Sequence, residues 1–104
     1  MAPIDRRLEL HELLCDILGT RHVYYQPPES IKMSYPAIVY KRDNIDNRSA
    51  DNLIYKQELA YSITVIDKNP DSTIVNDISR LPRCRFDRHY TANNLNHDVF
   101  RIYY

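Results

Sequence analysis

The sequence predicts an α+β fold: a mostly antiparallel sheet with a long projecting hairpin and two helices packed on one face. Two patterns carry this prediction. Apolar and polar residues alternate over 53–66 with the period of two that is typical of a strand, and apolar residues recur every three or four positions over 6–18, as on one face of a helix. Along the chain the expected elements come in the order α-β-β-β-α-β-β.

The first helix is expected from Arg6 to Leu18, with Asp5 as its N-cap. Its apolar face consists of Leu10, Leu13, Leu14, Ile17 and Leu18. Gly19 is the only glycine of the chain and stands where a left-handed C-cap is expected.

Two short strands are expected next, at His22–Gln26 and at Pro36–Lys41. Pro27 and Pro28 end the first of them, because proline cannot donate a hydrogen bond to a ladder. Residues 42–52 then contain seven Asp, Asn and Ser residues and the apolar Ile45. We expect them to form a polar loop of about ten residues, longer than the usual two to five of a hairpin, and long loops of this kind are often functional.

The strand over 53–66 organises the rest of the chain. One face carries Tyr55, Leu59, Tyr61, Ile63 and Val65, and the other carries Lys56, Glu58, Ala60, Ser62 and Thr64. At ~3.3 Å per residue the strand would be roughly 40 Å long, more than a small sheet can cover. We therefore expect the hairpin from Ala37 to Val65 to project, with its polar tip at 43–52.

The C-terminal part is expected to hold one helix and two strands. Asn69 as N-cap and Pro70 at the first helical position start the helix, and Pro82 stops it. Its buried stripe is Ile74, Val75, Ile78 and Leu81. Strands follow at 84–90 and 99–104, joined by a turn-rich connection at 91–98.

Length and charge limit the classes of protein. The 104 residues fit one domain, 1–104, and 14 basic residues balance 14 acidic ones. A neutral domain exerts no long-range attraction on nucleic acid or on an anionic membrane. Cys15 and Cys84 are too few for a disulfide scaffold, so reduced thiols are expected. No apolar run approaches the ~20 residues of a membrane span, and the polar N-terminal helix does not resemble a signal peptide, so we expect synthesis in the cytoplasm and no membrane partner.

Catalytic, metal and cofactor sites have little support. Asp87, His89, His97 and Asp98 lie close in sequence, but no third ligand stands at a recognisable metal spacing. For His97 and Asp98, a turn in which their side chains bond the local backbone is the simpler interpretation. Because Gly19 stands alone, there is no glycine-rich phosphate loop. We expect neither a cofactor nor an enzymatic activity.

One cluster of cations stands out: Arg80, Arg83, Arg85 and Arg88. Such a cluster could meet phosphate groups, or acidic residues of a neighbouring subunit. The neutral total charge and Asp87 within the cluster favour protein contact or solvent.

Tyrosine is the unusual residue of the composition, with nine copies against two phenylalanines and no tryptophan. Tyrosine suits surfaces that are buried against another protein. It also suits a β-rich core. Both interpretations remain open from composition alone.

Several phrases of the sequence resemble a known group of proteins. They are Tyr24-Tyr-Gln-Pro-Pro28, Met33-Ser-Tyr-Pro-Ala-Ile-Val-Tyr40, Tyr61-Ser-Ile-Thr-Val-Ile-Asp67 and Asn94-Leu-Asn-His-Asp98. Together they resemble the small tail-completion or tail-terminator proteins, which join tail to head in long-tailed bacteriophages. The resemblance covers most of the chain, and its motifs are structural phrases without a catalytic signature.

The resemblance implies a virion protein that forms a ring, usually of six subunits, at the head-proximal end of the tail tube. Its partners would be further copies of itself, the tail tube protein and the connector or neck proteins, while DNA only passes through the lumen. We expect the interface to include Asp43, Asn44, Asp46, Asn47, Arg48, Asp51, Tyr55, Arg83, Arg85 and Arg88. Contact between unlike patches of successive subunits would close the ring.

Two alternatives stay open from the sequence. The first is a head-side neck or stopper protein of the connector, or an adaptor with a similar small fold. The second is a small regulator that binds nucleic acid, which would show salt-sensitive affinity for DNA.

Overall fold

The computed structural model describes residues 3–28, 31–50 and 53–104, with side chains given for 6–28, 31–43 and 59–104. It confirms the α+β class and the order of elements. The elements are α1 (Pro3–Leu18), β1 (Val23–Tyr25), β2 (Ala37–Ala50), β3 (Leu53–Asp67), α2 (Thr73–Ser79), β4 (Cys84–Ala92) and β5 (Leu95–Tyr103). Five strands form one sheet in the order β1-β2-β3-β5-β4, in which only the β1–β2 pair is parallel.

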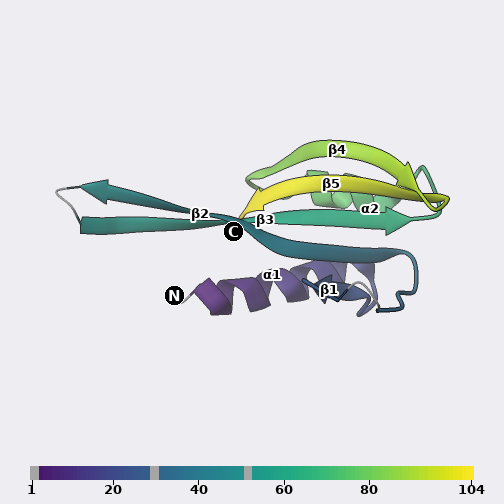
Figure 1. Cartoon of the computed structure of the whole chain (residues 1–104), viewed down its shortest axis with the longest axis horizontal. Coiled ribbons are helices and arrows are strands. Elements are labelled where there is room, and N and C mark those ends of the chain that lie inside the picture. The colour runs from purple at the N-terminus through teal and green to yellow at the C-terminus, as the bar shows by residue number, and fades with distance from the viewer. Residues whose placement is uncertain (1–2, 29–30, 51–52) are drawn as a thin grey trace.

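The long hairpin of β2 and β3 projects as expected, but it is longer than the sequence predicted. The strand β5 pairs with residues 60–67 of β3, and β1 pairs with residues 38–40 of β2. Beyond these partners β2 and β3 continue together as a two-stranded ribbon (Figure 1). We call residues 44–50 and 53–59 the arm and the remainder the body. The arm accounts for the elongated shape, with principal extents of 51 × 23 × 23 Å.

The predicted polar loop over 42–52 is therefore wrong for the residues up to Ala50, which belong to β2. The error has a physical reason. Alternation of apolar and polar residues marks a strand only when one of its faces is buried, and a two-stranded ribbon outside the sheet needs no apolar face. Asp51 and Asn52 lie outside the described residues.

One hydrophobic core lies on one face of the sheet, under both helices. The strands contribute Ile38, Tyr40, Leu59, Tyr61, Ile63, Val65, Phe100 and Ile102, and α1 contributes Leu10, Leu14, Cys15 and Leu18. From α2 comes Ile78, with Ile74 and Val75 packed against the cluster. The alternation predicted for 59–65 is thus confirmed, and so is the packing stripe of the second helix.

The helix boundaries differ from those predicted. The first helix begins at Pro3 rather than Arg6, so Asp5 lies inside it and is not its N-cap. Proline is favoured in the first turn of a helix because its missing N–H would have no partner there. At the other end Gly19 has φ +81° and donates its N–H to the Cys15 oxygen at 2.8 Å, as expected for a C-cap.

The second helix begins at Thr73, later than predicted, with Ser72 as its N-cap. Asn69 accepts instead from the Asp71 N–H at 3.0 Å, and Asp67 accepts from the Asn69 N–H at the same distance. These local bonds turn the chain between β3 and α2.

The predicted connection over 91–98 is also wrong. The β4–β5 turn is tight, because Ala92 pairs with Leu95 and both Asn93 and Asn94 have positive φ (53° and 62°). Two left-handed central residues are typical of the type I′ hairpin turn, and asparagine tolerates this conformation well. His97 and Asp98 consequently belong to β5.

Candidate interaction surfaces

The arm exposes backbone edges on both sides within the described part of the chain. The outer edge of β2 loses its partner where β1 ends, and that of β3 loses its partner where β5 ends. Register shifts in the β2–β3 pairing leave Asp43 and Tyr55 without a cross-strand partner. Such bulges disturb the row of edge hydrogen-bonding groups, which hinders the addition of a further strand. The arm is therefore better suited to contact through its faces than through its edges.

The register of the arm places like charges opposite one another. Asp46 stands across from Glu58, and two residues further along Arg48 stands across from Lys56. Like charges directly opposite in an antiparallel pair are destabilising. Among the other predicted interface residues, Asn44 stands across from Ala60 and Asn47 from Gln57. The register thus gives the arm one acidic and one basic cross-strand pair.

The body has one helix-free sheet face, which we call the open face. A row of polar residues crosses four of its strands, with Lys41 opposite Ser62, Ser62 opposite Arg101 and Arg101 opposite Arg85. The next row is Val39, Thr64, Val99 and Arg88. Ile66 and Val99 are almost fully buried but do not belong to the core cluster, so the open face has its own apolar floor.

Two predicted interface residues meet in a hollow on the open face, where the arm leaves the body. The hollow has a volume of about 270 Å³, and Asp43, Arg85 and Arg101 are among the residues that line it. The Nε of Arg101 lies 3.2 Å from Oδ2 of Asp43, but its N–H makes no hydrogen bond with any described group. Through Nε, the attraction between Asp43 and Arg101 is therefore a charge interaction without a directed bond. The sequence could have indicated Arg101, since it lies between the core residues Phe100 and Ile102 and must face away from the core.

The other two predicted arginines lie against tyrosine rings. The guanidinium of Arg83 is 5.5 Å from the ring centre of Tyr103, and that of Arg88 is 5.9 Å from the ring centre of Tyr90. Arg83 also has a positive φ of 61°, just before β4 begins. Tyr90 is 41% exposed and stacks on His97, with the ring centres 4.6 Å apart. The arginines and aromatic rings of β4 and β5 thus form a mixed surface of cations and π-systems.

A polar network that was not predicted from the sequence lies under β2, close to the base of the arm. The buried Tyr40 hydroxyl lies 2.7 Å from Nδ1 of His11 and accepts from Arg7 at 3.2 Å. With Nδ1 unprotonated, Tyr40 donates to His11, so both polar ends of the hydroxyl are satisfied. Arg7 also covers the Tyr25 ring at 4.4 Å. Burial lowers the pKa of His11, and the charges of Arg21 and Arg7 act in the same direction. Burial also raises the pKa of Tyr40.

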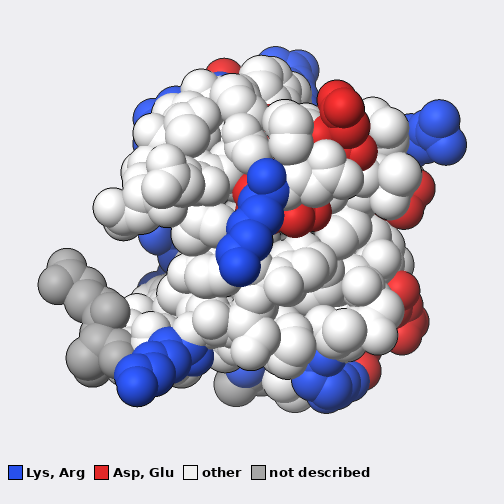
Figure 2. All heavy atoms as spheres, turned by 90° about the vertical axis from the view of Figure 1, so that its right-hand side faces the viewer, with Lys and Arg blue, Asp and Glu red and all other residues white. Residues whose placement is uncertain are grey.

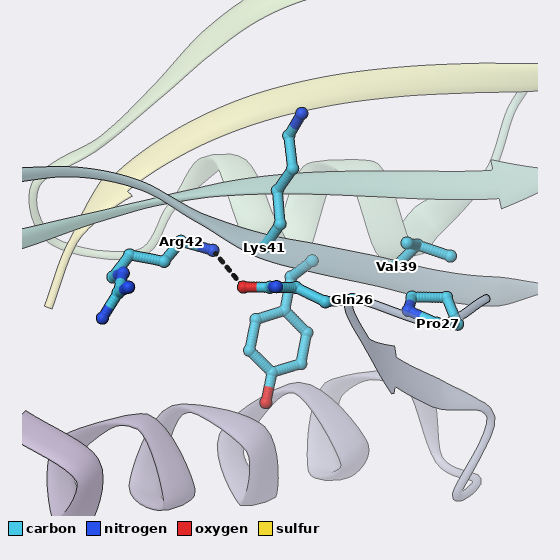
Figure 3. A pocket seen from close by; sticks show the side chains of 6 residues that line it. Gln26, Pro27, Val39, Lys41 and Arg42 are labelled. Carbon is cyan, nitrogen blue, oxygen red and sulfur yellow. Dashed lines mark hydrogen bonds between the residues drawn. The ribbon is translucent and has the colours of Figure 1, made fainter.

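A second hollow, of about 360 Å³, marks the place where β1 stops pairing with β2 (Figure 3). Gln26 has φ 45° and donates its N–H to the Tyr40 oxygen at 2.9 Å, and its side chain accepts from the Arg42 N–H at 3.4 Å. The side-chain oxygen of Gln26 thus takes the place of a further β1 residue, because it accepts the β2 backbone N–H that follows the end of the parallel pairing. Figure 3 also shows the Lys41 side chain extending away from α1, toward the open face.

The outer surface of α1 carries a patch of opposite sign to the open face. Leu8, Glu9, Glu12, Leu13 and Asp16 line a shallow groove there. Leu8 is 51% exposed, and Glu12 forms a bidentate ion pair with Arg21 at 2.8 and 3.0 Å. The bond from Arg21 lowers the pKa of Glu12.

The histidines near residue 90 contact different partners. His89 pairs with Asp98 across β4 and β5 at 2.7 Å, whereas His97 lies 3.1 Å from the Leu95 oxygen. No group of three potential metal ligands occurs among the residues that the structure describes. No described helix is long and apolar enough to cross a membrane.

Viewed from the end opposite the arm, charges of both signs are scattered over a largely uncharged surface (Figure 2). This end therefore offers neither a broad cationic nor a broad anionic field. No protein-family model and no curated protein matches the sequence.

Proposed function

We propose that the protein is a structural virion subunit that forms a ring at the head-proximal end of a phage tail tube. The ring ends the growth of the tube and joins the tail to the head. The observation that carries the proposal is the arm, a ribbon that leaves a small, fully formed domain and pairs with no further strand in the described part of the chain. Its partners are further copies of this chain, the tail tube protein and the neck proteins.

The chemistry of the arm supports contact with protein. An isolated two-stranded ribbon is at best marginally stable in water. The opposition of Asp46 to Glu58 and of Arg48 to Lys56 weakens it further. A protein surface with charges of both signs would compensate the acidic and the basic pair together. A DNA backbone would compensate only the basic pair.

The charge of the whole chain supports a lumen through which DNA passes without being read. Fourteen basic residues balance fourteen acidic ones, and Asp43 lies beside Arg101 at the base of the arm. Such a balance lowers the electrostatic attraction that governs non-specific binding to DNA. Under this proposal the protein acts in the virion, at the head-proximal end of the tail, after synthesis in the cytoplasm of the bacterial host.

Removing the arm tests this proposal. Replacing residues 46–58 with Asn-Gly keeps the pairing of Ile45 with Leu59 and closes it with a two-residue turn. We expect this variant to fold, because the core lies in the body, but to leave tails of uncontrolled length that are not joined to heads. Electron microscopy of particles assembled with the variant measures both properties. Normal tails and a normal titre of infectious particles would contradict the proposal.

The head-side alternative predicts a different location for the same subunit. A tail terminator purifies with headless tails, whereas a neck or stopper protein of the connector purifies with filled heads. Fractionating the two kinds of particle and probing each for the protein separates these functions. The regulator alternative predicts a shift of DNA mobility at low salt that salt abolishes, and the absence of a shift removes it.

A further inference from the structure

We infer that the outer surface of α1 on one copy of the chain docks on the open face of the next copy. This inference deepens the proposed ring and rests on it for the identity of the partner, a second copy of this chain. It names the two unlike patches through which successive subunits meet. The arm takes no part in the contact.

The first argument is charge complementarity. On the open face Lys41, Arg85, Arg88 and Arg101 outnumber the acidic Asp43 and Asp87 by two. On the outer surface of α1 the acidic Glu9, Glu12 and Asp16 outnumber Arg21 by two. These excess charges are exposed or partly exposed in the single subunit. A contact between the patches would balance them.

The second argument is the apolar content of both patches. The exposed Leu8 and the half-buried Leu13 lie among the acids of α1. The open face offers the half-buried Val39 and the exposed Tyr90. Each patch therefore combines an apolar part with a charged border, as a protein interface does.

The third argument is geometry. α1 packs on the core side of the sheet, and the open face is the other side, so the two patches lie on opposite sides of the body. Contact between unlike patches is heterologous, and it continues from subunit to subunit until the rotation closes a ring. Both patches belong to the body, from which the arm projects (Figure 1). The arms of all subunits would therefore stay free and leave a closed ring in equivalent directions.

Addition of a strand to the β4 edge is the weaker alternative. The edge strand β4 carries a bulge between Phe86 and Arg88, and its residues from Arg85 to Tyr90 are exposed. Bulges and charged side chains on an edge strand oppose pairing with another chain. The faces of the body are thus better prepared for contact than its free edge.

Chemical cross-linking of the full-length protein tests the inference even if the association is weak. One variant carries Leu8→Cys and the other Tyr90→Cys, both in a Cys84→Ser background, while the buried Cys15 remains. A short bismaleimide should join the two variants into a heterodimer at least about tenfold more efficiently than a control mixture of Leu8→Cys with Ile31→Cys. Leu8, Tyr90 and Ile31 are all exposed, so a cysteine at each position is accessible to the reagent.

Charge reversal then decides whether these patches attract one another. Arg85→Glu with Arg88→Glu on the Tyr90→Cys partner should reduce the yield about tenfold, and so should Glu9→Lys with Asp16→Lys on the Leu8→Cys partner. Mixing the two reversed partners should restore it. A yield equal to the control, or a loss that the double reversal does not restore, overturns the inference.

The outcomes separate this inference from the proposed function. If the cross-link cycle fails while removal of the arm still disrupts the tails, the ring is built through other faces and only this inference falls. If the cycle succeeds while removal of the arm leaves tails normal, the subunits associate as inferred and the proposed function falls.

Discussion

The body and the arm share one hairpin but place it in opposite surroundings. In the body, Tyr40 stands across from Ile63 and Ile63 across from Phe100, and all three are buried beneath the helices. In the arm the same ladder continues without a third strand, and the sequence of β2 turns polar. The strand pairing is similar in both regions, but the third strand and the helices that bury the body have no counterpart in the described part of the arm.

This difference separates stability from function. Side chains of the body hold the fold through burial, which contributes about 1.5–3 kcal/mol for each large apolar side chain. Among the residues whose side chains the structure describes, Leu59, at the border with the body, is the one arm residue in the core cluster. Changes in the body should therefore unfold the protein, and changes in the arm should alter what it binds.

The largest expected effect belongs to the middle of the body. Ile63→Ala should lower the free energy of unfolding by about 2–5 kcal/mol, because it removes buried methyl groups and leaves a cavity. Ile63 is fully buried between Tyr40 and Phe100 in the sheet. Urea unfolding followed by circular dichroism measures the loss. The exposed Leu8→Ala should change stability by less than about 0.5 kcal/mol, and an equal loss in both variants would contradict the comparison.

The sequence allowed the body to be predicted because its strands and helices bury one face each. The alternation at 59–65 and the leucine spacing of α1 both result from contact with one core. The β2 half of the arm escaped prediction because the polar sequence of 42–50 shows no alternation of apolar and polar residues. The short β4–β5 turn was missed for another reason: two asparagines can be part of a loose loop or take the left-handed conformation of a tight turn.

The candidate surfaces were predicted in part. The arginines of β4 and of the residues just before it were identified as a charge cluster, and Arg83, Arg85 and Arg88 lie on or beside the open face. Their relation to Asp43 and Arg101 depends on the register of four strands, which no local pattern gives. The acidic patch on α1 was missed because charged residues on the outer side of a helix are typical of any solvent-exposed helix.

The next largest expected effect comes from a change in the charge pattern of the arm that leaves the amino-acid composition of the protein unchanged. Exchanging two residues, Lys56→Glu with Glu58→Lys, turns both like-charge pairs into opposite ones, since Arg48 then faces an acid and Asp46 a base. Each corrected pair should stabilise the arm by about 0.2–1 kcal/mol. Hydrogen exchange of the arm amides should slow by roughly twofold to thirtyfold, while that of the body amides stays unchanged.

The matched control for this exchange is Lys56→Arg with Glu58→Asp, which keeps every sign. It should leave the amide exchange rates of the arm unchanged. If the arm charges serve a partner, the charge exchange should also reduce the joining of tails to heads although the arm is more stable. Unaltered amide hydrogen exchange in both variants would show that the opposition of like charges does not lower the stability of the arm.

A smaller effect concerns the network at the base of the arm. Because the pKa of His11 is lowered in the folded protein, the unfolded chain binds a proton at a higher pH than the folded one. The contribution of His11 to stability is therefore complete above the ordinary histidine pKa of about 6.5 and decreases as the pH falls toward the lower folded value. His11→Gln should show a smaller loss of stability than the parent protein between neutral and mildly acidic pH.

Urea unfolding of both proteins over this pH range measures the difference, and carboxylates common to both contribute equally. His11→Phe should cost about 1 kcal/mol at neutral pH, because it removes the acceptor of the Tyr40 hydroxyl. Identical pH profiles for the parent and His11→Gln would contradict the assignment of a titrating His11.

The smallest effect lies at the border between body and arm. Asp43 and Arg101 are both partly exposed, at 40% and 42% of their side-chain surface, and no directed hydrogen bond joins them through Nε. Asp43→Asn should therefore cost about 0.5 kcal/mol or less. A double-mutant cycle with Arg101→Gln isolates the pair, and its coupling should vanish at high salt because mobile ions screen exposed charges. A coupling above about 1 kcal/mol that resists salt would mean that the border is held as firmly as the body, and the boundary between the two regions would then move into the arm.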